Sequence, residues 1–238
     1  MNTESNPERA ESSPQSVTAA EDLQKAATSK LSEDMVLAIL KRPDLSAEVL
    51  ALLARNPNAI KSRKVALALA MHARTPRHIS IPALRRMFTF DLMRIALTPA
   101  VAADIKRAAE EQILHRLESV SAGERVSLAR RASGRVAAAL LRDSDLRVVT
   151  AALDNSQLVE VFVVAALMKS DAPGSLFEVV SQHPKWSLRR DVQIALLRSE
   201  STPLERAREL ARHFSAAALQ EIVPESRNNV WQSETPQR

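Results

Sequence analysis

The chain has 238 residues, of which 45% are hydrophobic, so it can bury a sizeable core in one or two domains. It contains no Cys, which excludes disulfides, thiolate nucleophiles and Cys-ligated metal clusters, and only three Gly, too few for several phosphate-binding loops. The net charge of +5 is unevenly distributed, because residues 1–34 carry −4 and the remaining 204 residues carry +9.

The two ends of the chain are predicted to be disordered polar tails. Residues 1–18 are rich in Ser, Pro and Glu, and we interpret them as an acidic solubilising leader, with folding back onto the basic body as the alternative. Residues 223–238 have the same character apart from Val230 and Trp231. No secretory signal precedes the chain's body and no apolar run approaches about 18 residues, so we expect a cytoplasmic protein without a membrane span.

Residues 19–222 are predicted to form one helical domain. Aromatic residues make up 3% of the chain while Ala, Leu and Arg dominate, which favours an all-α protein of about a dozen helices. The pairs Thr75-Pro76, Thr98-Pro99 and Thr202-Pro203 predict helix starts with Thr as N-cap and Pro as first residue. The remaining predicted start signals are Ser32, Ser46, Ser121 with Glu124, Asp145, Ser156, Pro173, and Glu205 as the capping-box partner of Thr202. Residues 99–119 are predicted to form one longer helix.

An internal repeat supports this reading. "NPNAIKSRKVALALAMHARTP" (56–76) aligns without a gap with "HPKWSLRRDVQIALLRSESTP" (183–203), and seven of the 21 pairs are identical. "RVVTAAL" (147–153) matches the second stretch at a shift of 43 residues, and "KRAAEEQIL" (106–114) is a weaker copy. The resulting register of about 42 residues predicts two helices per repeat.

The repeats carry a resemblance to known helical arrays. "DSDLRVVTAAL" (143–153) resembles a HEAT repeat, and the two longer stretches resemble the bacterial variant leucine-rich repeat. This similarity covers roughly residues 32–222 and implies a right-handed α-solenoid of short antiparallel helix pairs. It implies no particular activity.

Basic residues gather in one part of the sequence. Between residues 55 and 94 there are nine of them and one acid, Asp91, which predicts a positive potential able to attract nucleic acid, anionic lipid or an acidic protein tail. A solvated face is the alternative. We call these residues the basic cluster: Arg55, Lys61, Arg63, Lys64, Arg74, Arg77, Arg85, Arg86 and Arg94.

Three arginines recur in the aligned repeats, namely Arg63, Arg147 and Arg190. We favour a ladder in which each arginine pairs with an Asp of a neighbouring repeat, with a row of cations along a phosphate backbone as the alternative. The candidate acids are Asp143, Asp145 and Asp191. "FTFDLMRIALTP" (88–99) is interpreted as the core of a helix junction, although it could anchor a peptide.

Within the second stretch, His183, Trp186 and Arg189 have no similar residue in the first copy, so they are its candidate binding residues. For Trp186 we favour a structural wedge between repeats over stacking on a partner.

We predict a non-enzymatic scaffold that binds a protein partner on its concave face, without cofactor or metal. The five His show no metal-ligand spacing, and no nucleotide-binding or hydrolase motif is present. The alternative is a nucleic-acid-binding solenoid that uses the basic cluster. HEAT-like alkylpurine DNA glycosylases resemble the chain in fold and charge, but the aromatic cluster around a carboxylate that the resemblance requires is missing.

Overall fold

The computed structural model describes residues 31–223, and within this range the protein consists of α-helices and one short 3-10 helix, without strands. The prediction of an all-α protein is confirmed. The chain divides into two compact units, unit 1 (Met1–Ala109) and unit 2 (Glu110–Arg238), and the boundary falls inside one helix. The predicted tail at residues 1–18, residues 19–30, and the predicted tail at residues 223–238 apart from Val223 lie outside the described residues. Val223 itself is buried at the end of α16.

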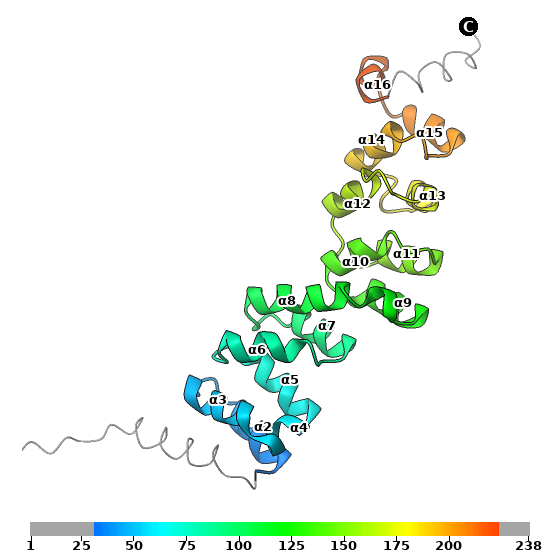
Figure 1. Cartoon of the computed structure of the whole chain (residues 1–238). Helices are drawn as coiled ribbons and strands as arrows, with labels where there is room; N and C mark the ends of the chain where they lie inside the picture. The colour runs from blue at the N-terminus through cyan, green and yellow to red at the C-terminus, as the bar shows by residue number, and fades with distance from the viewer. Residues whose placement is uncertain (1–30, 224–238) are drawn as a thin grey trace, which may run out of the picture. The chain divides into compact units, whose positions relative to one another are not determined.

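The helices are shorter and more numerous than predicted (Figure 1). Unit 1 contains α2 (Glu33–Leu40), α3 (Ala47–Arg55), α4 (Pro57–Lys61), α5 (Arg63–Met71), α6 (Arg77–Leu84) and α7 (Thr89–Leu97), and α8 (Ala103–Leu114) crosses the boundary. Unit 2 contains η1 (Leu117–Ser119), α9 (Ala122–Arg131), α10 (Gly134–Leu140), α11 (Leu146–Leu153), α12 (Glu160–Leu167), α13 (Gly174–Gln182), α14 (Arg190–Arg198), α15 (Leu204–Ala211) and α16 (Ala216–Ile222). The single long helix predicted over 99–119 is therefore wrong, because α8 ends at Leu114.

Four of the eight predicted polar N-caps are confirmed. Ser32, Ser46 and Asp145 each accept a backbone N–H from the first turn of the helix that follows. Ser121 and Glu124 form the predicted capping box at the start of α9. Two predictions are wrong: α12 follows Val159 rather than Ser156, and Pro173 lies one position before the first residue of α13. These helix starts are consequently local properties of the sequence, set by a side-chain oxygen beside free N–H groups.

The Thr-Pro pairs mark helix boundaries, but their threonines do not cap the helices that follow. The Thr75 hydroxyl donates to the carbonyl oxygen of Leu69, and the Thr202 hydroxyl to that of Leu196, at 2.6 Å in both cases. Both hydroxyls therefore satisfy a last-turn carbonyl of the preceding helix, where backbone acceptors lack partners within the helix. The N-cap prediction for these threonines is wrong.

The third Thr-Pro pair and the predicted capping box also differ from the prediction. Thr98 donates to the carbonyl of Arg94 at 2.7 Å, and α8 begins only at Ala103. Glu205 accepts from Arg208 at 3.1 Å and forms no capping box with Thr202. Pro76 and Pro203, like Pro173, lie one position before the first residues of their helices, so they are N-caps and not the predicted first helical residues.

We expect Thr202→Val to lower the free energy of unfolding by about 1 kcal/mol, because it removes one of two donors to the buried carbonyl of Leu196 while keeping the side-chain volume. The other donor, the backbone N–H of Ser199 at 3.3 Å, remains. Thr202→Ser retains the hydroxyl and is the matched control, with a smaller loss. Urea unfolding followed by far-UV circular dichroism measures both. Equal losses for the two variants would show that the hydroxyl contributes nothing.

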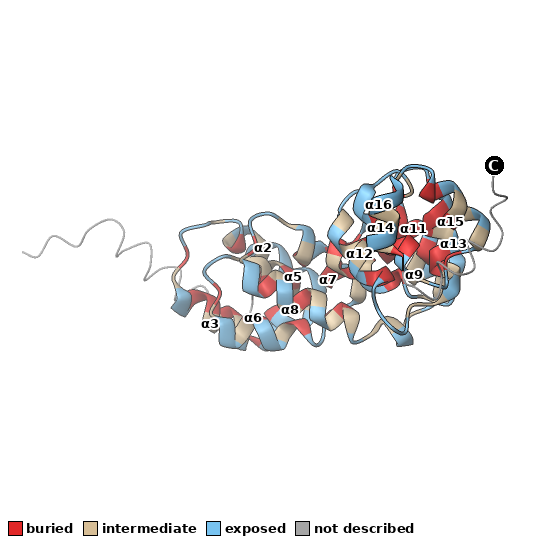
Figure 2. Ribbon diagram, turned by 90° about the horizontal axis from the view of Figure 1, so that it is seen from above, coloured by how far each residue is buried: buried red, intermediate tan, exposed pale blue. Residues whose placement is uncertain are grey.

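Helices in each unit bury one face against their neighbours, as the red positions in Figure 2 show. α2 packs on α5, α9 on α11, and α12 on α14. Two of these pairs also contact the helix that follows them in the chain, since α5 packs on α6 and α14 packs on α15. Apolar residues at helical spacing form the interior, for example Val36, Val49, Leu53, Val65 and Leu69 in unit 1.

The repeat predicted from the sequence is visible in the helix bounds. α2, α3, α5 and α6 coincide, residue for residue, with α12, α13, α14 and α15 at an offset of 127, and α7 and α16 share their start at the same offset. The threonine hydrogen bonds described above are related by this offset as well. The two stretches are therefore copies in local structure and not only in sequence.

The number of helices in each period differs from the prediction. The first helix of each period begins at residue 33, 77, 122, 160 or 204, and these helices are α2, α6, α9, α12 and α15. Each complete period contains three α-helices, or four in the first period, which includes the short α4. The repeat unit thus contains three principal helices, and the two-helix unit that we predicted is wrong. Helices of seven to ten residues fit three into about 42 positions because one- to six-residue turns join most of them.

Candidate functional site

All nine side chains of the basic cluster belong to exposed residues. Three of them are paired with carboxylates: Arg63 with Asp91 at 2.7 Å, Lys64 with Glu33 at 3.0 Å, and Arg77 with Asp104 at 2.5 Å. Arg74 donates to the backbone carbonyl of Asp44. Protein carboxylates therefore neutralise a third of the cluster, which reduces the charge that it offers to an anionic partner.

The predicted arginine ladder is present at one position only. Arg63 binds Asp91 through two hydrogen bonds, of 2.7 and 3.0 Å, and its guanidinium lies 4.5 Å from the centre of the Phe88 ring. Arg190 covers the ring of Phe214 in the same way, at 5.1 Å, but Ala218 stands where Asp91 would be expected. A regular ladder therefore does not extend into unit 2 at this position.

Arg147 is not equivalent to Arg63 or Arg190. The buried positions of α11 match those of α14 at a shift of 44 rather than 43, which places Arg147 level with Asp191. Its guanidinium binds Asp145, the N-cap of its own helix, at 2.7 Å. Arg107, which belongs to the weaker copy at residues 106–114, is the fifth residue of α8 and not its first. The row of equivalent arginines is consequently wrong.

The stretch 88–99 contributes to the core, as predicted, through Leu92, Met93 and Ile95 of α7, which are buried. Its two Phe do not: Phe90 is 37% exposed, and Phe88, which precedes α7, is 63% exposed. The guanidinium of Arg63 covers one face of its ring.

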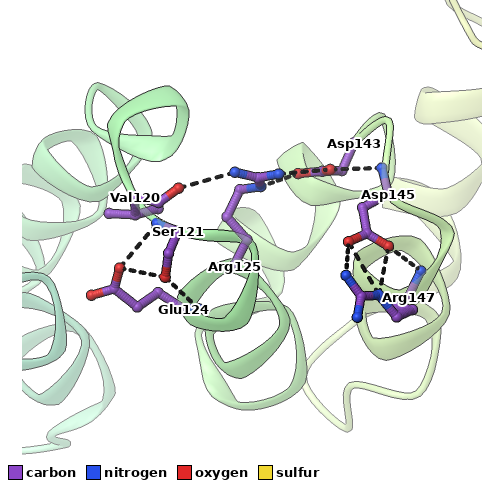
Figure 3. Close-up of polar contacts among 7 residues, drawn as sticks. All are labelled: Val120, Ser121, Glu124, Arg125, Asp143, Asp145 and Arg147. Carbon is purple, nitrogen blue, oxygen red and sulfur yellow. Dashed lines mark hydrogen bonds and ion pairs between the residues drawn. The ribbon is translucent and has the colours of Figure 1, made fainter.

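A polar cluster in unit 2 joins α9 to the turn before α11 (Figure 3). Arg125 binds Asp143 at 2.7 Å, and the two side chains are only 21% and 9% exposed. Arg125 also donates to the carbonyl of Val120, while Asp143 accepts the backbone N–H of Asp145. Every group in this cluster is paired within the protein, so we assign it a structural role.

Trp186 lies in the protein interior. It is 1% exposed, and its indole N–H donates to the carbonyl of Leu153 at 2.8 Å. Lys185 covers the ring from the other side, with its ammonium 4.0 Å from the ring centre. A partner has no access to this ring, so we remove Trp186 from the candidate binding residues. Arg189 precedes α14 and is exposed.

His183 has a structural equivalent in unit 1, although the residue there is Asn56 and not His. Its Nδ1 accepts the backbone N–H of Lys185 at 3.2 Å, and Asn56, which is 127 positions earlier, accepts that of Asn58 at 3.0 Å. His72 and Ser199 form a second such pair at the same offset. Each side chain ends one helix and fixes the turn that follows, so His183 is a structural residue.

The feature that the sequence did not predict is a groove between α12 and α14. It has a volume of about 580 Å³ and apolar side chains along both helices. Val161 and Met168 lie on its α12 side and are 66% and 55% exposed. The lining residues are Glu160, Val161, Val164, Met168, Asp191, Ile194, Ala195 and Arg198.

The same face of unit 1, between α2 and α5, carries different chemistry. Asp34 and Lys41 occupy the positions of Val161 and Met168, so the two most exposed apolar positions of the groove are charged in unit 1. Lys64 there binds Glu33, and both belong to the first turns of their helices.

The equivalents of Glu33 and Lys64 in the groove are Glu160 and Asp191. Two carboxylates thus replace an ion pair, and neither forms an ion pair or side-chain hydrogen bond with any described residue. In the sequence, this site corresponds to positions at which the two copies have different residues, and not to positions at which they are identical.

Glu33 offers a pH-dependent test of the ion pair in unit 1. Hydrogen bonds from Ser62 and Lys64 lower the pKa of Glu33 below its ordinary value of 4.5. The stabilisation from ionised Glu33 is therefore complete above pH 4.5 and is lost as the pH falls through the lower folded-state pKa. We expect Lys64→Met to raise the pKa of Glu33 towards its ordinary value, as measured by NMR titration of the side-chain carboxyl. An unchanged pKa would contradict the pairing.

Comparison with known proteins found no matching family model, no similar curated protein and no similar solved structure. Among residues 31–223 no group of His, Cys, Asp and Glu side chains is arranged to hold a metal ion. No helix in the same range is long and apolar enough to cross a bilayer.

Proposed function

We propose that this chain is a non-enzymatic helical-repeat scaffold that binds a protein partner in the groove between α12 and α14. The observation that carries the proposal is the apolar surface of that groove. Val161 and Met168 are large and exposed, and they line the groove together with Val164 of α12 and Ile194 of α14. A contiguous exposed apolar surface in a folded protein is typical of an interaction site.

The internal copy strengthens this argument. Both copies preserve the helix bounds and most of the buried positions, and unit 1 keeps Leu37, Leu67 and Ala68 at the positions of Val164, Ile194 and Ala195. The fold of the repeat therefore does not require apolar residues at the two exposed positions of Val161 and Met168. The copy in unit 1 carries Asp34 and Lys41 there and is equally able to form its helices. An apolar surface that packing does not require, and that solvent disfavours, is best explained by a partner.

We also propose that the three-helix repeats stack as a right-handed α-solenoid of the HEAT-like class. The recurring contacts support this arrangement, since α5 and α14, the third helices of two repeats, each pack both on the first helix of their own repeat and on the first helix of the next one. Arrays of this kind bury a continuous core and present long surfaces to partners.

The experiment compares the wild-type chain with a variant that restores the residues of the other copy. Full-length protein and Val161→Asp/Met168→Lys are used as bait, and captured proteins are identified by mass spectrometry. We expect the wild type to retain a protein that the double variant loses. Leu188→Asp is the control, because Leu188 is 75% exposed and lies outside the groove. Equal capture by all three chains would overturn the proposal.

Nucleic-acid binding through the basic cluster is the second candidate. It is favoured by the exposure of all nine side chains, and disfavoured by the carboxylates that pair with Arg63, Lys64 and Arg77. It predicts a mobility shift of random duplex DNA at low salt that weakens steeply as salt is added. The absence of any shift at low salt would eliminate it.

A further inference from the structure

We propose that the groove between α12 and α14 recognises a basic segment of its partner, in which a Lys or Arg side chain binds Glu160 and Asp191 beside an apolar residue that packs on Val161 and Met168. This inference rests on the proposed function and specifies the chemistry of its ligand.

The first argument comes from the equivalent site in unit 1. There the ammonium of Lys64 lies 3.0 Å from a carboxylate oxygen of Glu33. Glu160 occupies the position of Glu33, but Asp191 occupies the position of Lys64, so the protein supplies no cation at this place. The position that an internal lysine fills in one copy is thus left to an external cation in the other.

The second argument is the state of the two carboxylates. Glu160 is half-buried and Asp191 is exposed, both line the groove, and neither has an ion-pair partner among the described residues. They lie in the first turns of α12 and α14, where the helix dipoles stabilise negative charge in the absence of a ligand. Two acids at one site also repel each other, and a bound cation would relieve that repulsion.

The third argument is the order of acidic, apolar and basic side chains along the groove. Asp191 is the second residue of α14 and Arg198 is its last, seven residues or about 10 Å further along the helix axis. Ile194 and Ala195 lie between them, opposite Val161 and Val164 of α12. A segment with a cation at one end, an apolar side chain next to it and an acceptor for Arg198 beyond would match every group in this order.

The experiment selects ligands without assuming a partner. A displayed library of random peptides is panned on the full-length chain, with Val161→Asp/Met168→Lys used for counter-selection. We expect the enriched peptides to share a Lys or Arg adjacent to an apolar residue. Their dissociation constants are then measured by fluorescence polarisation against wild type and variants.

We expect Asp191→Asn to weaken binding of the enriched peptides about tenfold and Asp191→Lys about a hundredfold or more, since the latter restores the cation of the other copy. Glu178→Lys is the matched control, because it makes the same change of charge as Asp191→Lys. Glu178 lies on the exposed surface of α13 outside the groove, so this variant should bind the peptides within about twofold of the wild-type affinity. Peptides with Glu in place of the selected basic residue should prefer Asp191→Lys to the wild type. Thermal unfolding of each variant shows that it remains folded.

The outcomes separate this inference from the proposed function. Enriched peptides that lack a basic residue, or that bind Asp191→Lys as tightly as the wild type, would overturn the inference and leave a protein-binding groove. If no peptide distinguishes the wild type from Val161→Asp/Met168→Lys, both proposals fail. A wild-type dimer in sedimentation that Val161→Asp/Met168→Lys converts to a monomer would make a second copy of the chain the occupant, which also overturns the inference.

Discussion

Replacing Trp186 by Ala is expected to destabilise unit 2 by about 3–5 kcal/mol, the range for removing a large aromatic side chain from a core. Trp186 is the largest of the fully buried side chains and lies in the turn between α13 and α14. Its removal creates a cavity between helices and leaves the carbonyl of Leu153 without the indole donor that it has now. Urea unfolding followed by circular dichroism measures the loss.

Two further variants separate the contributions of volume and hydrogen bonding. Trp186→Phe keeps most of the ring volume and removes the indole N–H, so we expect a loss of about 1–2 kcal/mol. Leu188→Ala, two positions away at an exposed site, should change the free energy of unfolding by less than about 0.5 kcal/mol. If Trp186→Ala were no more destabilising than Leu188→Ala, the ring would not be part of the core.

The corresponding position in unit 1 explains why Trp186 resembled a binding residue in the sequence. Ala59 occupies that position and is also buried, so the difference between the copies is one of volume inside the core. An exposed anchor and a core wedge are both large, apolar and different from the aligned residue. Only the surroundings, here Leu153 and Lys185, distinguish them.

The helix starts and the internal offset were predictable because they depend on short-range chemistry. A side-chain oxygen placed before free N–H groups identifies Ser46 or Ser121 without knowledge of the fold. Thr75 and Thr202 show the limit of such reasoning, since a hydroxyl can accept from the next helix or donate to the previous one. Their burial beneath the turn selects the second bond, and burial is a property of the packed structure.

The groove could not be predicted from the residues that the repeats share. Its apolar and acidic character lies at positions where the copies differ, such as Asp34 and Val161 or Lys64 and Asp191. A mismatch in an alignment has many causes, and these mismatches become one site only because α12 packs directly on α14. The three-helix unit was missed for a different reason, because a break as short as the two residues between α9 and α10 is hard to recognise within an apolar periodicity.

The largest effect of a small substitution is expected at Gly134, the first residue of α10. A Cβ atom added there would lie 2.2 Å from the backbone oxygen of Gln157 and 3.1 Å from its carbonyl carbon. The Gln157 peptide has little freedom to move, because its N–H donates to Asn155 at 2.7 Å. The amide of Asn155 in turn donates to the carbonyls of Ala129 and Ala132. We therefore expect Gly134→Ala to lower the free energy of unfolding by about 2–3 kcal/mol.

Gly174 provides a matched control for this prediction, because it is also the first residue of its helix, α13. A Cβ atom there meets nothing within 4 Å, and unit 1 has Ala47 at the equivalent position. We expect Gly174→Ala to be neutral or to stabilise unit 2 by up to about 1 kcal/mol, since Ala loses less backbone entropy than Gly on folding. Urea unfolding of both variants should give changes of opposite sign or clearly unequal size. A Gly134→Ala variant as stable as Gly174→Ala would mean that the turn containing Gln157 moves freely, and that the Asn155 hydrogen bonds do not hold it against α10.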